Sequence, residues 1–118
     1  MNAEFINALS DIEKEKGVSK NYMLEAIEAA LAAAYKRDFG PGKNVRVSVD
    51  RQDGDVSIYV QYNVVEEVEN DQIELALPDA RRIRPTAEVG EIVEVETQER
   101  NFGRIAAQTA KQVVVQRL

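Results

Sequence analysis

Hydrophobic residues change their spacing twice along this chain of 118 residues, and the change limits the folds that the chain can adopt. They recur every three to four residues up to about Phe39, every second residue from Val45 to Val64, and every three to four residues again after Asn101. The first and third spacings predict amphipathic helices, and the second predicts strands with one buried face. Helices at both ends with strands between them predict an α+β fold.

Two helices are expected before the strands. The first ends at Gly17, and the second begins after Ser19, whose hydroxyl is a favourable helix cap. The second helix continues to about Phe39 and has apolar residues around most of its circumference, so it must be covered on two sides. The apolar positions of the first helix are Phe5, Ile6, Leu9 and Ile12.

A small, mainly antiparallel sheet of three to four strands is expected in the middle of the chain. Residues 45–49 and 56–64 alternate in polarity around Asp53-Gly54, which predicts a hairpin with one wet face. Residues 73–77 predict a third short strand, and Pro78 then favours the first turn of a brief helix that ends at about Ile83. Residues 93–97 predict a last strand.

The last eighteen residues, 101–118, predict a long C-terminal helix with an apolar stripe on one side and Arg104 and Lys111 on the other. This segment contains three basic residues and no acidic one, although the formal net charge of the chain is −6. The acidic excess therefore lies before the segment. Its apolar pattern continues through Val115 and Leu118, so we expect a helix that runs on into a longer protein.

Composition excludes several kinds of function. A chain of this length can bury one hydrophobic core, which predicts a single domain. The sequence has no apolar run of about 20 residues and no basic signal-peptide start, so we expect a cytoplasmic protein. It contains no cysteine and no histidine, which removes thiolate chemistry, the commonest general base and the commonest zinc ligand. We therefore expect neither an enzyme nor a protein with a metal or cofactor.

Three groups of charged residues have more than one interpretation. The acid-rich stretch 66–74 is either a solvated loop or a metal-ligand cluster, but it lacks the spacing of a calcium loop. Lys36 and Arg37 either stabilise the end of the second helix or face an anionic partner. The third group, Arg81, Arg82 and Arg84, is either a set of helix-end cations or a phosphate-facing patch.

The segment FGRIAAQTAKQVVVQR, residues 102–117, resembles the end of the N-terminal domain in the NusA family of bacterial transcription factors. The sequence EAIEAAL, residues 25–31, followed by AYKR, residues 34–37, resembles the same domain near its beginning. The resemblance therefore covers both ends of the chain, and the middle is similar in pattern.

The resemblance implies a domain that docks on RNA polymerase beside the RNA exit channel, at the flap of the β subunit. Such a domain promotes pausing, hairpin-dependent termination and antitermination, and its last helix leads to an OB-fold domain and two KH domains, which this sequence does not include. The cations that would face RNA are Lys36, Arg37, Arg104 and Lys111. The apolar positions that would contact the flap are Leu9 and Ile12.

The acidic body predicts that nascent RNA is bound weakly, or only within the complex with polymerase, because like charges repel over a Debye length of about 8 Å. We expect a monomer on this interpretation. A different class of function remains open, namely a structural domain that associates with itself by pairing its C-terminal helices. That pairing would use Val114, Val115 and Leu118.

Overall fold

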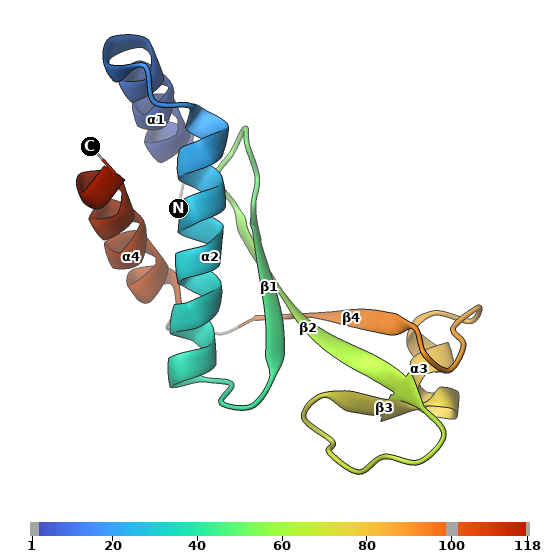
Figure 1. Ribbon diagram of the computed structural model, residues 1–118. Helices are drawn as coiled ribbons and strands as arrows, with labels where there is room; N and C mark the ends of the chain where they lie inside the picture. Colours follow the sequence, from blue (N-terminus) through green and yellow to red (C-terminus); the bar gives the residue numbers. More distant parts are fainter. Residues whose placement is uncertain (1–2, 99–101, 118) are drawn as a thin grey trace.

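The computed structural model describes residues 3–98 and 102–117, and within them an α+β fold of four helices and four strands, which confirms the expected fold class (Figure 1). The order of elements is α1 (Ala3–Lys16), α2 (Lys20–Asp38), β1 (Asn44–Val49), β2 (Val56–Val65), β3 (Glu74–Ala76), α3 (Leu77–Ile83), β4 (Ile92–Thr97) and α4 (Phe102–Arg117). None of the helices in these ranges is long and apolar enough to cross a lipid bilayer.

The connection between α1 and α2 has the stop and start that the sequence predicts. Gly17 adopts a φ of +74°, a conformation that favours glycine, and its N–H donates a hydrogen bond to the carbonyl of Glu13 at 3.0 Å. Ser19 then caps α2, because its hydroxyl oxygen accepts the N–H of Tyr22 at 3.3 Å.

The long strand β2 is the centre of the sheet. Its residues 56–61 pair with β1 in antiparallel register, and residues 58–63 pair with β4, also antiparallel, on the opposite edge. The short strand β3 pairs with residues 63–65 in parallel register. The sheet is therefore mainly antiparallel, as expected, although the third strand is only three residues long and Leu77, predicted as its end, begins α3.

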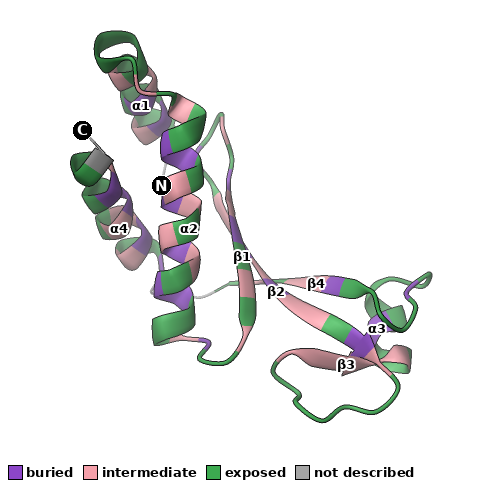
Figure 2. Ribbon diagram, viewed as in Figure 1, coloured by how far each residue is buried: buried purple, intermediate pink, exposed green. Residues whose placement is uncertain are grey.

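The chain buries two hydrophobic clusters, so the expectation of one core is wrong. The larger cluster is formed by residues of α1, α2, α4 and β1 together with Ile58 of β2. The smaller one contains Val64, Ala80, Ala87 and Val93. Because β2 is ten residues long, it contributes Ile58 to the first cluster and Val64 to the second, and α3 covers the second. Figure 2 shows buried segments at both ends of the molecule.

The two clusters make the molecule elongated, with extents of 52 × 27 × 21 Å. Its radius of gyration is 16.6 Å, compared with about 13.5 Å for a compact domain of this length. We call the part containing α1, α2, α4 and β1 the helical lobe, and the part containing β3, α3 and the adjoining ends of β2 and β4 the distal lobe (Figure 1).

Helix α2 is the buried centre of the helical lobe, which confirms that it is covered on more than one side. It packs against α1, α4 and β1, and its residues Met23, Leu24, Ile27 and Leu31 have no exposed surface. Helix α4 contacts α2 through a stripe whose members are three or four residues apart, the spacing of one helix face. The stripe consists of Phe102, Ala106, Ala110 and Val113.

Candidate functional site

Two cations lie on the exposed side of α4. Arg104 and Lys111 are both exposed, whereas the stripe that contacts α2 is buried. They are seven residues apart, so they lie on the same face of the helix at a separation of roughly 10 Å along its axis. Within the described part of the chain, neither forms an ion pair with a carboxylate. Both positive charges are therefore available to an external anion.

An aromatic cluster fixes the beginning of α4 against the end of α2. The ring of Phe102 contacts Tyr35 and Phe39 edge to face, with centroid separations of 5.5 and 6.1 Å. Tyr35 and Phe39 also contact each other, with centroids 5.5 Å apart. Because Arg104 is two residues after Phe102, this contact brings it to the end of the helical lobe where Lys36 and Arg37 lie.

Arg37 is paired with its neighbour Asp38. Its Nε and Nη2 atoms donate to Oδ1 and Oδ2 of Asp38, each at 3.0 Å. These hydrogen bonds raise the pKa of the Arg37 guanidinium and lower the pKa of the Asp38 carboxyl, so both groups stay ionised and their charges offset each other. Lys36 is exposed and forms no ion pair within the described residues. Of these two neighbours in α2, Lys36 is therefore the one whose charge is not offset by a carboxylate.

The two apolar positions expected to contact a partner lie mostly inside the helical lobe. Leu9 is 1% exposed and belongs to the larger cluster, and Ile12 is partly buried against the same cluster. The burial of Leu9 leaves it almost no surface with which to touch another protein. The outward side of α1 consists mainly of polar and charged side chains.

The distal lobe exposes apolar side chains that the sequence pattern did not single out. Four large hydrophobic residues there are between 42% and 53% exposed, namely Val68, Ile83, Val89 and Ile92. The exposure of Ile92 could have been predicted from the sequence, because Ile92 and Val93 are adjacent in a strand and must point to opposite faces of the sheet. Val93 is buried, so Ile92 lies on the wet face.

The wet face of the sheet is held together by a polar network. The guanidinium of Arg46 in β1 donates to both oxygens of Glu94 in β4, at 2.8 and 3.0 Å, and lies over the ring of Tyr59, 4.3 Å from its centroid. The Nε2 atom of Gln61 donates to the same carboxylate at 2.9 Å. The bonds from Arg46 and Gln61 lower the pKa of Glu94, so this carboxyl stays ionised and is unsuited to act as a proton donor.

The three arginines of the distal lobe are engaged with their own lobe, which favours their interpretation as structural cations. Arg81 donates to the carbonyl of Ala87 at 3.0 Å. The other two form ion pairs, Arg82 with Asp79 at 3.6 Å and Arg84 with Glu91 at 3.2 Å.

The acid-rich loop is organised by a carboxylate. Glu74 accepts hydrogen bonds from the N–H groups of Asn70 and Glu69, each at 2.9 Å, and these bonds lower its pKa. Across the residues that the structure describes, no three or more histidine, cysteine, aspartate or glutamate side chains come together as a metal site. Glu74 is therefore a structural acceptor within this loop.

The residues named for self-association lie on different sides of α4. Val114 is partly buried against the larger cluster, whereas Val115 is 73% exposed beside Lys111, Gln112 and Gln116. Leu118, the third position, lies outside the described residues. Of Val114 and Val115, only Val115 is therefore accessible for pairing with another helix.

Comparison with known proteins gives a consistent family. Residues 4–118 match the NusA N-terminal domain family. Over all 118 residues, the chain is 52% identical to the transcription termination/antitermination protein NusA of Halalkalibacterium halodurans and 48% identical to that of Bacillus subtilis. It spans 31% and 32% of the length of these relatives. The solution structure of the N-terminal domain of NusA from B. subtilis is similar, with a TM-score of 0.85, 49% identity, and coverage of 99% of this chain and 94% of that one.

Proposed function

Because the chain belongs to the NusA N-terminal domain family, we propose that it is the RNA polymerase-binding module of a transcription termination/antitermination factor. The module docks beside the RNA exit channel, at the flap of the β subunit, and promotes pausing, hairpin-dependent termination and antitermination. It acts without a cofactor and in the cytoplasm, where it meets transcribing polymerase.

The observation that carries this proposal is the pair of exposed cations on α4, neither of which forms an ion pair with the residues that the structure describes. Arg104 and Lys111 face away from a body that carries the acidic excess of the chain. Free RNA is repelled by that body over a Debye length of about 8 Å, so two cations alone give weak binding. Once contacts with polymerase hold the domain in place, the same cations meet RNA phosphates at short range, where they position the transcript without reading its sequence.

Lys36 and Arg37 extend this cationic surface at the end of α2. Lys36 contributes a full positive charge, whereas the bonds between Arg37 and Asp38 reduce the net charge at the neighbouring position. We therefore assign Lys36 the larger effect on RNA at this corner.

The docking surface for the flap is proposed on α1, beside Ile12. The burial of Leu9 supports a role in holding α1 in position, while Ile12 retains part of its surface for a partner. A second candidate contact position is Ile92 in the distal lobe, because it is a large apolar side chain that is 53% exposed. Ile12→Glu and Ile92→Glu variants distinguish the two, because only the variant on the true docking surface loses polymerase binding.

The test is binding of the chain to core RNA polymerase, followed by transcription of a template with a hairpin-dependent pause. The expected result is a complex with polymerase and a longer pause when the chain is added. A chain that fails to bind core polymerase at micromolar concentration contradicts the proposal. Free RNA without polymerase is the control, and we expect little binding to it at physiological salt.

The second candidate is the self-associating structural domain, which the 73% exposure of Val115 favours. Sedimentation over a concentration series separates the two functions. A docking module remains a monomer until polymerase is added, whereas a pairing domain forms dimers by itself and Val115→Lys prevents them.

A further inference from the structure

The outer edge of β1 presents backbone groups that pair with none of the four described strands. The N–H of Asp50 donates to the carbonyl of Asp55 at 2.9 Å. This bond shows which residues of β1 direct their N–H and C=O groups toward β2 and which direct them away from it. In an antiparallel ladder the hydrogen-bonded pairs alternate, so Asn44, Arg46 and Ser48 point their backbone groups at β2. The N–H and C=O groups of Val45, Val47 and Val49 consequently point away from the sheet.

Two further backbone hydrogen bonds of β2 show the same alternation. The N–H of Val64 donates to the carbonyl of Glu91 on the β4 side, at 2.9 Å, and the N–H of Asn63 donates to Ile73 on the β3 side, at 2.7 Å. Residues with odd numbers in β2 therefore point their backbone groups toward β1 and β3, as the ladder requires.

At Val49 this outer edge is closed by side chains. The carboxylate of Glu28 in α2 accepts the N–H of Val49 at 2.8 Å, and the guanidinium of Arg51 donates to the carbonyl of Val49 at 2.8 Å. Arg51 and Glu28 also form an ion pair at 2.9 Å. Among the described residues, Val45 and Val47 have no equivalent side-chain partners for their outward backbone groups. We call the edge open at these two positions because these groups lack hydrogen-bond partners; Val45 is partly exposed, whereas Val47 is 5% exposed.

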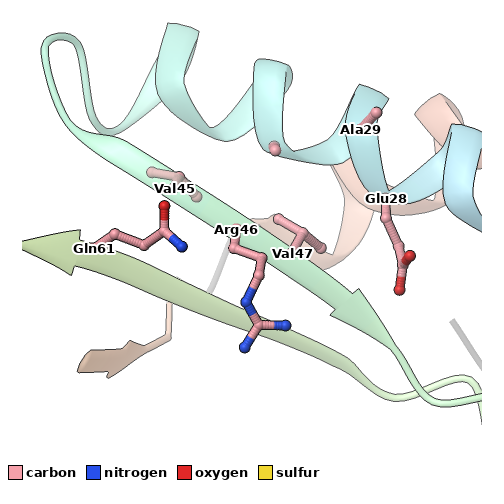
Figure 3. Close-up of a pocket in the computed structure, with 7 residues that line it drawn as sticks. Glu28, Ala29, Val45, Arg46, Val47 and Gln61 are labelled. Carbon is pink, nitrogen blue, oxygen red and sulfur yellow. The ribbon is translucent and has the colours of Figure 1, made fainter. Parts of the chain in front are cut away.

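A groove lies along the open part of the edge (Figure 3). Its volume is about 340 Å³, and its lining consists of Glu28, Ala29, Ala32, Val45, Arg46, Val47 and Gln61. The α2 wall is low because Ala29 and Ala32 end at a methyl group. The lining includes residues from both faces of the sheet, since Val45 and Val47 face the helices and Arg46 faces the opposite side. The groove therefore crosses the edge of the strand.

The two ends of the groove differ in charge. Lys43 directly precedes β1, and Lys36 follows Ala32 by one helical turn, so this end is basic. Because α2 and β1 run in opposite directions, the other end lies near Glu25, which precedes Ala29 by one turn, and near the exposed Asp50. The charges of Glu28 and Arg51 offset each other there.

We propose that this edge binds an extended segment of a partner protein, which adds to the sheet as a strand beside β1. Backbone groups of the segment pair with the open N–H and C=O groups of Val45 and Val47, the recognition mode known as β-augmentation. One apolar side chain of the segment packs between the alanines of α2 and the valines of β1. Charge complementarity orients the segment, with an acidic residue at the Lys36 and Lys43 end and a basic residue at the Glu25 end.

The experiment uses the isotope-labelled chain and a short synthetic peptide of alternating valine and threonine, with a glutamate at one end and a lysine at the other. At saturating peptide, amide exchange at Val45 and Val47 is expected to slow about tenfold or more. Exchange at Arg46 and Ser48, whose N–H groups are already in the ladder, should change little. A matched peptide that is N-methylated at the backbone amides facing β1 should have no effect, because it keeps the side chains and loses the donors.

Two variants of the chain provide a second control. Ala32→Lys places a long side chain in the groove and should abolish the protection, whereas Ala33→Lys, turned about 100° around the helix, should leave it intact. Equal binding of the N-methylated peptide, or protection confined to residues outside β1, overturns the proposal. Slower exchange at Val45 and Val47 on raising the concentration of the chain alone also overturns it, because the occupant is then a second copy.

Discussion

The ring of Phe102 meets the ring of Tyr35 edge to face, with centroids 5.5 Å apart and ring planes at 87°. Both side chains are buried, at 3% and 4% exposure. The contact joins the first residue of α4 to the last turns of α2, and the rest of the buried stripe continues it along α4. The position of the cations Arg104 and Lys111 relative to the body therefore depends on this aromatic contact.

Phe102→Ala is expected to cost about 3 to 5 kcal/mol of unfolding free energy, since it deletes a buried aromatic ring. The loss should be accompanied by faster amide exchange in α4 than in α2, because α4 loses its anchor. Urea unfolding and hydrogen exchange measure the two effects. Val115→Ala, at a position with 73% exposure on the same helix, is the control and should change stability little. An unchanged midpoint in the Phe102 variant would show that the contact does not hold α4.

Arg104→Glu is expected to reduce pause enhancement while leaving the melting temperature nearly unchanged, because the side chain is exposed and forms no ion pair among the described residues. In-vitro transcription and thermal unfolding check the two parts. Arg82→Glu reverses a charge on the distal lobe and should leave pausing unaffected. If Arg104→Glu lowers pausing and melting temperature together, Arg104 is a structural residue.

Ile27→Ala is expected to destabilise the chain by about 2 to 5 kcal/mol, a large share of the ~5 to 15 kcal/mol that stabilises a typical domain. Ile27 lies at the centre of α2 with no exposed surface, so the deletion leaves a cavity. Chemical denaturation measures the change. A variant as stable as the parent chain would remove Ile27 from the core.

Val93→Ala should loosen the distal lobe before the helical lobe, because Val93 belongs to the smaller cluster. The expected cost is about 1 to 3 kcal/mol, seen first as faster amide exchange at Val64 and Gly90, which close the β2–β4 connection. The matched control is Val47→Ala, which makes the same deletion in the larger cluster. Uniform acceleration of exchange in both variants would mean that the two clusters unfold as one unit.

Stability should be constant between about pH 5 and 8, because the chain has no histidine to titrate there. Below that range it should fall. Folding lowers the pKa of Glu94 through Arg46, of Asp50 through the N–H groups of Asp53 and Gln52, and of Glu74 through those of Asn70 and Glu69. As pH falls, the carboxyl groups of the unfolded chain therefore bind protons before those of the folded chain. The stability contributed by these three carboxylates is complete above the unfolded-state pKa of about 4. It is lost as pH falls toward their lower pKa values in the folded chain.

Melting temperatures measured from pH 3 to 8 test this dependence, and Glu74→Gln should make the acid slope shallower. A melting temperature that rises on acidification would contradict the direction of these pKa shifts.

Local chemistry was enough to predict most of the secondary structure and part of the candidate site. The stop at Gly17, the cap at Ser19, the hairpin around Gly54 and the helix with Pro78 in its first turn all follow from backbone and side-chain properties of residues close in sequence. The outward orientation of Arg104 and Lys111 also follows from helical periodicity alone. Family membership was predicted from two short segments near the ends of the chain.

Tertiary structure decided the features that depend on residues far apart in sequence. Periodicity shows which face of α1 is apolar, but only packing shows that Leu9 is 1% exposed while Ile12 is partly accessible. The second cluster arises because β2 extends beyond the helices, and the Arg46–Glu94 pair joins residues 48 positions apart.

The open edge of β1 is also a property of the assembled sheet, because it depends on which strands pair and on where α2 passes. Sequence spacing thus determined the elements and their faces, since each element is set by interactions within a few residues. The folded chain determined which of those faces remain accessible, since burial is a sum over contacts that only the complete packing supplies.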